Sequence, residues 1–408
     1  MLDPDAPGSS VAIYFVLENG QDYYLRRNTD AGAIGVRALG DRTVEFRLAA
    51  PAPYFMSVMN RPDGGPQPRH AIERQGDSWT EPGRQVVSGP FEQSHRSDDR
   101  LVLRRQARYV GKRPGNVGEI AVLRSDTDEA LELYERDEVD VIAARYTPRL
   151  ADLMPPSTPE VELGPAGWTG YLSFDHSHAV TSNVDLRRAL AHAIDRAALA
   201  DVAPPNLVVA TGGLVPPALQ GHTPDIAPRF EPETAREHLS RSGFSGRIGL
   251  AALAEWEPII GRVAAMWRDT LGLEIELRWW TNEEAVHLTT PWHLAPIALG
   301  GWLPGYPDPE YYLRLELHSD SRTNEGGFAY APFDELIERA RQERSDRRRL
   351  ELFHDADRMA IADRVALIPL VYGRSMAFVK PRVKGWWEFG KTSSSFADLV
   401  VDERSSQA

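Results

Sequence analysis

The segment between residues 165 and 300 constrains the fold most, because strand-like and helix-like runs alternate along it. Short apolar runs indicate buried strands, and runs with apolar residues every three or four positions indicate amphipathic helices. In chain order they are a strand at 167–175, helices at 183–201 and 232–243, a strand at 248–253, a helix at 256–272 and a strand at 273–280. This order predicts an α/β fold, in which helices cover a sheet.

The helix expected at 183–201 has the clearest periodicity. Its buried face is predicted from three apolar residues at four-residue spacing: Leu186, Leu190 and Ile194. Its arginines are expected to point outward: Arg187, Arg188 and Arg196. Two of the other helices are expected to end at glycines, Gly243 and Gly272.

The first 150 residues are richer in predicted strands than in helices. Strands are expected at 11–17 (VAIYFVL), 43–48, 100–110 and 119–125, before an acidic helix capped by Asp126. Near the C-terminus, two helices split near Ser345 are followed by strands at 365–373 and 375–385 that we expect to return to the first part of the chain. The 408 residues exceed one ordinary core. The domains predicted are lobe I (1–167), lobe II (168–365) and a return to lobe I with a C-terminal tail (366–408).

Charge and cysteine content exclude several classes of function. The formal net charge of −13 disfavours a nucleic-acid partner, which needs a basic surface. The absence of cysteine excludes disulfides, thiol catalysis and thiolate metal sites. The sequence has no apolar run of 18 residues and no signal peptide at its start. We therefore expect either a cytoplasmic protein or a true N-terminus upstream of Met1.

The sequence lacks the common catalytic motifs. It contains no GxSxG elbow, Walker A loop, GxGxxG fingerprint or HExxH pair. His176 and His178 could share a metal ion with Asp175, but a polar loop after a strand explains them better, since no further ligand cluster is evident. We expect no enzyme activity, no cofactor and no metal.

Residues 300–312 (GGWLPGYPDPEYY) combine prolines and glycines with aromatic residues. Prolines cannot continue a helix, so the aromatic rings lie on rigid irregular backbone. Tryptophan usually packs in a core, but Trp302 lies between these prolines and tyrosines. This pattern favours a binding surface at Trp302.

Seven segments in order along the chain resemble one known family, the family 5 extracellular solute-binding proteins of peptide and nickel ABC importers. They are LDP (2–4), SGPF (88–91), RRQARYVGKRPG (104–115), DEVDVI (137–142), YLSFD with DLRRALAHAIDR (171–196), GWLPGYPDP (301–309) and IPLVYGRSMAFVKPRVKGW (368–386). The segment 301–309 is similar to the family's GWxADYPDP loop, which lines the ligand cleft.

The resemblance implies a two-lobed, class II periplasmic-binding-protein fold that closes on a ligand at a hinge. We expect the hinge near 167–170 and 366–369, and a first lobe that is N-terminally incomplete. The ligand contacts expected are Trp302, Leu303, Gly305, Tyr306, Tyr171 and Tyr372. The implied function is capture of a peptide or other small ligand for ABC permease subunits, by a monomer in the periplasm or outside the cell.

Two departures from the family pattern leave alternatives open. Gly305 stands where oligopeptide binders carry an aspartate for the ligand's α-ammonium, so we expect a ligand without a free α-amino group at this point. The start of the family pattern, with its signal peptide, has no counterpart before Met1. The alternative function is therefore a ligand-sensing module of a larger regulatory protein, not a transport component.

Overall fold

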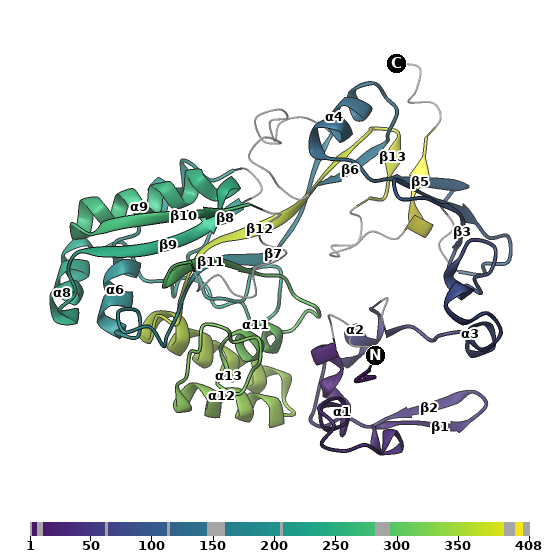
Figure 1. The fold of residues 1–408 in the computed structure, drawn as a ribbon, viewed down its shortest axis with the longest axis horizontal. Coiled ribbons are helices and arrows are strands. Elements are labelled where there is room, and N and C mark those ends of the chain that lie inside the picture. Colours follow the sequence, from purple (N-terminus) through teal and green to yellow (C-terminus); the bar gives the residue numbers. More distant parts are fainter. Residues whose placement is uncertain are drawn as a thin grey trace. The chain divides into compact units, whose positions relative to one another are not determined.

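The computed structural model describes residues 2–5, 11–61, 64–111, 115–144, 160–204, 207–281, 294–386 and 396–402 (Figure 1). The chain forms two compact units. Unit 1 contains Met1–Gly65 and Ala166–Gly373, and unit 2 contains Pro66–Pro165 and Arg374–Ala408.

A mixed sheet runs through unit 1 in the order β10-β9-β11-β7-β12, and β8 also pairs with β12. Its strands are β7 (Val161–Phe174), β8 (Leu207–Val209), β9 (Arg247–Leu253), β10 (Glu274–Trp280), β11 (Ile297–Trp302) and β12 (Leu367–Val379). Strand β9 is parallel to β10 and β11, whereas β11 is antiparallel to β7. The first part of β7 and the last part of β12 belong to unit 2.

The helices of unit 1 build two cores. The first core packs α6 (Val184–His192), α8 (Pro232–Ser242) and α9 (Glu257–Leu271) with the sheet, around the fully buried Trp267. Figure 1 shows α9 lying along β9 and β10. The second core packs α11 (Pro309–Leu317), α12 (Ala331–Gln342) and α13 (Asp346–Arg358). Within the described part of residues 166–373, the other elements are α7 (Arg196–Ala200), η5 (Ala254–Trp256) and the π-helix η7 (Met359–Asp363).

The N-terminal part of unit 1 has its own small core. Its elements are η1 (Val11–Val16), α1 (Gly20–Tyr24), η2 (Ala31–Ala33), β1 (Val36–Gly40), β2 (Thr43–Phe46) and α2 (Phe55–Met59). Tyr54 joins this core to the rest of unit 1, because its ring stacks on Tyr306 with centroids 4.1 Å apart. This contact explains why residues 1–65 group with the 166–373 segment.

Unit 2 is built around a three-stranded antiparallel sheet, in the order β3-β4-β5. Its elements are α3 (Arg69–Gln75), η4 (Gly76–Thr80), β3 (Phe91–Arg96), β4 (Arg100–Arg105), β5 (Glu119–Leu123), α4 (Thr127–Glu135), β6 (Val141–Ala144), β13 (Val383–Lys384), η8 (Phe396–Asp398) and β14 (Val400–Val401). Strand β6 pairs with the Met376–Val379 end of β12. Asp126 caps α4 as predicted, since its carboxylate accepts the N–H of Glu129.

Most predicted elements between 165 and 300 are confirmed. The ends of α8 and α9 fall at Gly243 and Gly272, which adopt positive φ angles of 68° and 66°. The single helix expected at 183–201 is wrong, because the chain forms α6 and α7 with a break before Asp195. The carboxylate of Asp195 accepts the N–H groups of Ala197 and Ala198 and so starts a new helix.

Two further expectations are wrong. Residues Val11–Val16 form a 3₁₀ helix instead of a strand, since Ile13, Tyr14 and Leu17 are buried together on one side. Arg187 is 3% exposed instead of pointing outward. Its guanidinium donates to the carbonyls of Thr181, Ser182, Arg364 and Val365 at 2.8–3.0 Å, so burial leaves its charge well solvated by peptide groups.

Arg196 is also turned inward, contrary to the prediction. It donates to the backbone carbonyls of Ala210 and Pro228. Arg188 is more exposed than Arg187, since its side chain is 31% exposed, although it too reaches a carbonyl, that of Asp363.

The compact units do not coincide with the predicted lobes. Residues 1–65 and 66–165 fall into different units, although both were expected in lobe I. The breaks after residues 165 and 373 lie close to the two predicted crossings. The expected hinge segment at 167–170 lies inside β7, and the one at 366–369 falls at the start of β12. Because compact units describe packing and not motion, the lobe boundaries and the hinge remain predictions.

Candidate functional site

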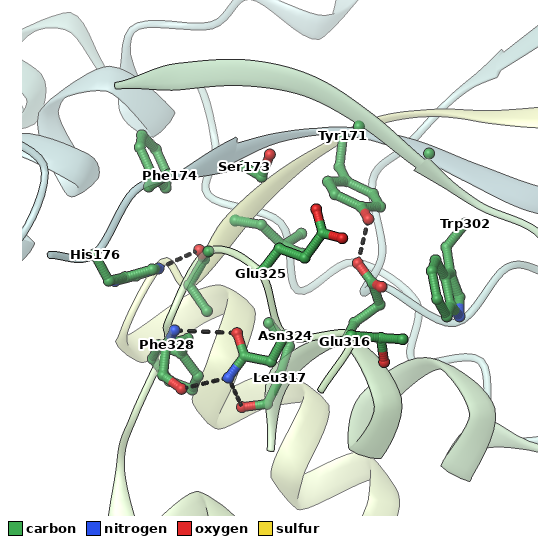
Figure 2. A pocket seen from close by; sticks show the side chains of 16 residues that line it. Tyr171, Ser173, Phe174, His176, Trp302, Glu316, Leu317, Asn324, Glu325 and Phe328 are labelled. Atoms are coloured by element: carbon green, nitrogen blue, oxygen red, sulfur yellow. Dashed lines mark hydrogen bonds between the residues drawn. The ribbon is translucent and has the colours of Figure 1, made fainter. Parts of the chain in front are cut away.

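A pocket of about 270 Å³ lies within unit 1 (Figure 2). Strands β7 and β11 form one side of it, and α11 with the loop at 323–328 forms another. The start of β12 adds Ala366 and Leu367. The pocket is therefore assembled from segments far apart in the sequence.

Aromatic side chains supply much of the pocket wall. Tyr171 comes from β7, Trp302 from the end of β11 and Phe328 from the loop after α11. The indole N–H of Trp302 donates to the carbonyl of Tyr311 at 2.9 Å, which fixes the ring against the pocket. Gly300, opposite Tyr171 in the sheet, has no room for a side chain because a Cβ would lie 2.6 Å from that tyrosine ring.

Two carboxyl groups, those of Glu316 and Glu325, also line the pocket. The Tyr171 hydroxyl donates to the carboxylate of Glu316 (Figure 2). Burial raises the pKa of Glu316 to about 8, and the nearby charge of Glu325 acts in the same direction. Burial also raises the pKa of Glu325. Glu316 therefore carries a proton for much of the time near neutral pH.

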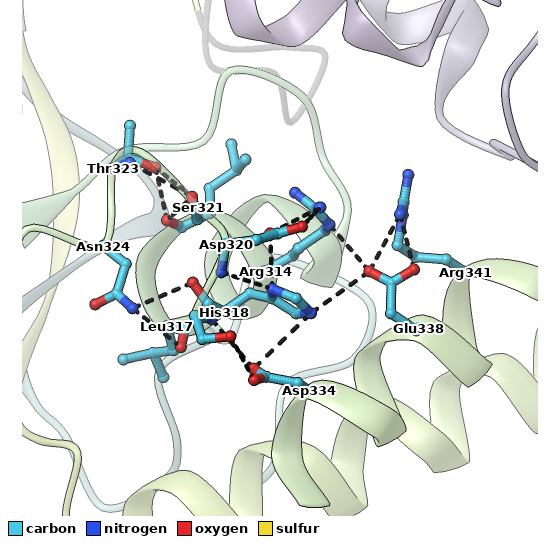
Figure 3. Close-up of polar contacts among 12 residues, drawn as sticks. Arg314, Leu317, His318, Asp320, Ser321, Thr323, Asn324, Asp334, Glu338 and Arg341 are labelled. Carbon is cyan, nitrogen blue, oxygen red and sulfur yellow. Dashed lines mark hydrogen bonds and ion pairs between the residues drawn. The ribbon is translucent and has the colours of Figure 1, made fainter. Parts of the chain in front are cut away.

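Asn324 holds the loop that bears Glu325. Its side-chain amide donates to the carbonyl of Phe328 at 2.7 Å, and its side-chain oxygen accepts the N–H of Phe328 at 3.1 Å (Figure 2). The same amide donates to the carbonyl of His318 at 3.1 Å (Figure 3). The hydroxyl of Thr323 donates to the carbonyl of Leu315 at 2.6 Å. These bonds hold this wall of the pocket in place without a bound ligand.

A network of ion pairs ties the same loop to α12 (Figure 3). His318 is 6% exposed, with Nδ1 2.7 Å from the carboxylate of Asp320 and Nε2 3.5 Å from that of Glu338. Arg314 reaches Asp320 and Arg341 reaches Glu338. Because arginines neutralise these carboxylates, the cluster serves to join α11 and α12. Among the described residues, no group of three or more His, Asp or Glu side chains is arranged to hold a metal ion.

His176 lies at the other end of the pocket (Figure 2). Its ring nitrogen Nε2 lies 2.9 Å from the carbonyl of Ala366, and its backbone N–H donates to Gly326. Burial, aided by the charge of Arg187, lowers the pKa of His176 to about 4. The imidazole is therefore neutral near pH 7 and brings no positive charge to the pocket.

The structure brings together only some of the predicted contact residues. Trp302 and Tyr171 both line the pocket. Leu303 is 62% exposed, next to Trp302. Tyr372 is 2% exposed, and its hydroxyl donates to the carbonyl of Gly213 at 2.8 Å, away from this pocket.

Gly305 and Tyr306 take part in packing beside the pocket. A Cβ at Gly305 would lie 2.7 Å from side-chain atoms of both Ile13 and Tyr311, so the space beside this glycine is filled by the protein itself. Tyr306 is 6% exposed and stacks on Tyr54. The roles of all six residues in ligand binding remain predictions.

The family of the chain follows from its sequence. The pattern described as "Bacterial extracellular solute-binding proteins, family 5 Middle" matches residues 1–324. The chain belongs to this family. This confirms the resemblance drawn from the seven segments and gives the protein a substrate-binding role.

Known relatives of this family 5 protein agree with the assignment. The periplasmic oligopeptide-binding protein OppA of Salmonella typhimurium is 27% identical over 95% of this chain and 74% of its own length. The probable deoxycholate-binding periplasmic protein YgiS of Escherichia coli is 25% identical over 88% of this chain and 68% of its own length.

Solved structures establish the fold. The murein tripeptide binding protein MppA of Escherichia coli superposes with a TM-score of 0.80 over 98% of this chain and 81% of its own, at 19% identity. The predicted α/β fold of the two-lobed periplasmic binding proteins is thereby confirmed. In the described part of this family 5 protein, no helix is long and apolar enough to cross a membrane.

The ligand contacts predicted from the sequence did not include the two carboxyl groups of the pocket. Glu316 follows Tyr312 by four positions and Leu313 by three, so it shares their side of α11, and both of these residues are fully buried. An acidic residue on the apolar face of a helix is a signal that the sequence does contain. Glu325 lies in a loop whose path the sequence does not specify.

Proposed function

We propose that this chain is the solute-binding component of an ABC importer and captures a peptide or peptide-like ligand. The observation that carries the proposal is the pocket beside Trp302 and Tyr171 in a member of a solute-binding family. Aromatic walls with a few polar groups are typical of sites that take organic ligands. The oligopeptide specificity of the relative OppA supports a peptide as the ligand class.

The resemblance to the family supports the rest of the proposal. The protein acts as a monomer in the periplasm or at the outer face of the cell, and closure of two lobes presents the ligand to permease subunits. Binding by itself performs no chemistry, so no catalytic residue is needed. A cytoplasmic ligand-sensing module is the alternative, and it differs in predicting binding without uptake.

Calorimetry with a mixture of short synthetic peptides, and separately with deoxycholate, tests the ligand class. We expect binding of at least one peptide, and we expect Trp302→Ala to weaken it about tenfold or more. Trp279→Ala is the matched control, because Trp279 is 38% exposed on β10 and does not line the pocket. Thermal melts of both variants separate lost binding from lost folding.

Three results would contradict the proposal. Tight binding of deoxycholate with no binding of peptides would overturn the ligand class. An unchanged affinity in a folded Trp302→Ala variant would overturn the site. Peptide binding without peptide uptake in cells that express the protein with its neighbouring permease genes would favour the sensing alternative.

A further inference from the structure

The described residues that line the pocket include two acidic side chains, those of Glu316 and Glu325. None of the described residues that line it is lysine or arginine, and His176 is neutral near pH 7. No cation among the described residues forms an ion pair with Glu316 or Glu325, and the Tyr171 hydroxyl is the donor that reaches Glu316. The pocket therefore has an excess of negative charge when ionised.

Other carboxylates of α11 form ion pairs with arginines. Asp308, the cap of α11, receives both Nη groups of Arg349 at 2.7 and 2.8 Å. Glu310 lies 3.2 Å from the guanidinium of Arg341. Burying a carboxylate costs free energy unless a cation pairs with it, and both Asp308 and Glu310 pair with an arginine. Among the described residues Glu316 has no such cationic partner, which leaves room for a cation supplied by the ligand.

The wall around the carboxyl groups suits an organic cation. The rings of Tyr171 and Trp302 lie beside Glu316 in the pocket (Figure 2). Aromatic rings attract a cation placed within about 6 Å of their faces and also pack against its carbon chain. A volume of about 270 Å³ is small for a whole peptide, since pockets for drug-sized ligands measure about 300–1,000 Å³. One end or one side chain of a ligand fits better.

We propose that this pocket binds an alkylammonium group of the ligand, placed between the carboxyl groups of Glu316 and Glu325 and beside the rings of Tyr171 and Trp302. This inference rests on the proposed function and specifies its ligand class: a peptide that bears a lysine side chain or a free N-terminus. Both sources present the same –NH₃⁺ group, which can donate to both carboxylates at once.

Proton release accompanies this binding. An ammonium group favours the ionised form of Glu316, whose pKa is about 8 without ligand because of burial. The other titratable groups that face it are the Tyr171 hydroxyl from β7, Tyr311 and Tyr312 on α11, and Glu325 from the loop. The pKa values of the three tyrosines are all raised, so they stay neutral. For a lysine ammonium group, which stays charged over this range, binding therefore strengthens as pH rises toward about 8, because more of Glu316 is already ionised. An α-ammonium group begins to lose its own proton at about pH 8, so this gain is smaller for a free N-terminus.

Four synthetic peptides separate the possible sources of the ammonium group. Ala-Nle-Ala-NH₂ carries the α-ammonium group alone, and Ac-Ala-Lys-Ala-NH₂ carries the side-chain ammonium alone. Ala-Lys-Ala-NH₂ carries both, and Ac-Ala-Nle-Ala-NH₂ carries neither. Calorimetry of the full chain at pH 6 and pH 8 gives each affinity, and titrations in two buffers of different ionisation enthalpy give the protons released.

We expect at least one charged peptide to bind about tenfold or more tightly than the neutral one, with proton release. Glu316→Gln should remove most of this preference, and Glu325→Gln should reduce it if Glu316→Gln does not fold. Glu335→Gln is the matched control, since Glu335 is an exposed residue of α12 outside the pocket, and it should keep the preference.

The outcomes distinguish this inference from the function on which it rests. If the neutral peptide binds as tightly as the charged ones, the ammonium site is wrong and peptide capture survives. If the preference persists in a folded Glu316→Gln variant and in Glu325→Gln, the ammonium group binds at another part of the protein and the inference fails. If no peptide binds at all, both the proposed function and the ammonium site are overturned.

Discussion

Two charged residues that point into unit 1, Arg187 and Glu316, have different kinds of partner. Arg187 and Glu316 both lie on helix faces shared with apolar residues, and both are turned inward. Arg187 finds four backbone carbonyls, so its burial is a structural tie between α6 and residues 364–365. Glu316 accepts a hydrogen bond from the Tyr171 hydroxyl and lines the pocket. This difference from Arg187 supports the assignment of Glu316 as a ligand contact.

Gly305 shows how one residue can be required by packing and still resemble part of a binding site. Replacing it with alanine should destabilise the protein by about 1–3 kcal/mol, because overpacking forces neighbours to shift. The neighbours here are Ile13 and Tyr311, each with atoms 2.7 Å from the position of the new Cβ. Urea unfolding of the wild type and the variant measures the change.

The neighbouring Gly301→Ala is the control for this prediction. A Cβ at Gly301 would lie 3.6 Å from the nearest side-chain atom, an ordinary contact distance, so the free energy of unfolding should change little. Equal effects of the two substitutions would show that the space beside Gly305 adapts and that packing does not require glycine there.

Elements with a strong apolar period were predictable from the sequence, and elements fixed by distant contacts were not. The buried residues Leu186, Leu190 and Ile194 are 0% exposed, as the four-residue spacing indicates. The run Val11–Val16 has the composition of a strand, but it forms a 3₁₀ helix because Tyr14 and Leu17 pack into a core with Tyr54 and Tyr306. Local propensity carries no information about such partners.

The site follows the same rule. Trp302 and Tyr171 could be proposed from their motifs, and both line the pocket. The loop that completes the pocket depends on Asn324. Its side chain makes four hydrogen bonds, to the backbone of Leu317 and His318 at the end of α11 and to that of Phe328. A sequence shows that an asparagine stands in a loop but not which carbonyls it reaches.

Asn324→Ala should therefore loosen one wall of the pocket. We expect a loss of about 1–3 kcal/mol in the free energy of unfolding, because carbonyl and N–H groups of Phe328 and His318 lose their partners. Hydrogen exchange should accelerate in the segment 315–328 and not in α9, and the affinity for the charged peptides should fall.

The control is Asn28→Ala, which removes one local hydrogen bond to Asp30 in an exposed loop. It should change the free energy of unfolding by less than about 0.5 kcal/mol. Unchanged exchange at 315–328 in Asn324→Ala would mean that the other contacts, such as the ion pairs of His318 and the hydrogen bond of Thr323, are enough to hold the loop.

The whole molecule groups segments in a way that chain order does not reveal. Residues 1–65 pack with the segment 166–373, although the hundred residues between them belong to the other unit. The stacked rings of Tyr54 and Tyr306 form part of this connection. The sequence around either tyrosine does not indicate that the two residues are in contact. Local patterns indicated an α/β fold, and the family resemblance supplied its two-lobed architecture.

Net charge is a property of the whole molecule and should affect how fast a ligand arrives. With 59 acidic and 46 basic residues, the formal charge of −13 attracts a cation over a distance set by salt. The Debye length falls from about 30 Å at 0.01 M salt to about 8 Å at 0.15 M. We therefore expect the association rate of Ala-Lys-Ala-NH₂, followed by tryptophan fluorescence in a stopped-flow instrument, to fall severalfold over this range. The rate for Ac-Ala-Nle-Ala-NH₂ should stay nearly constant. Glu316→Gln changes the total charge by at most one, so it should mainly raise the dissociation rate, as expected for a contact made only after arrival. Equal salt dependence for the two peptides would contradict steering by net charge and leave local contacts as the source of any preference.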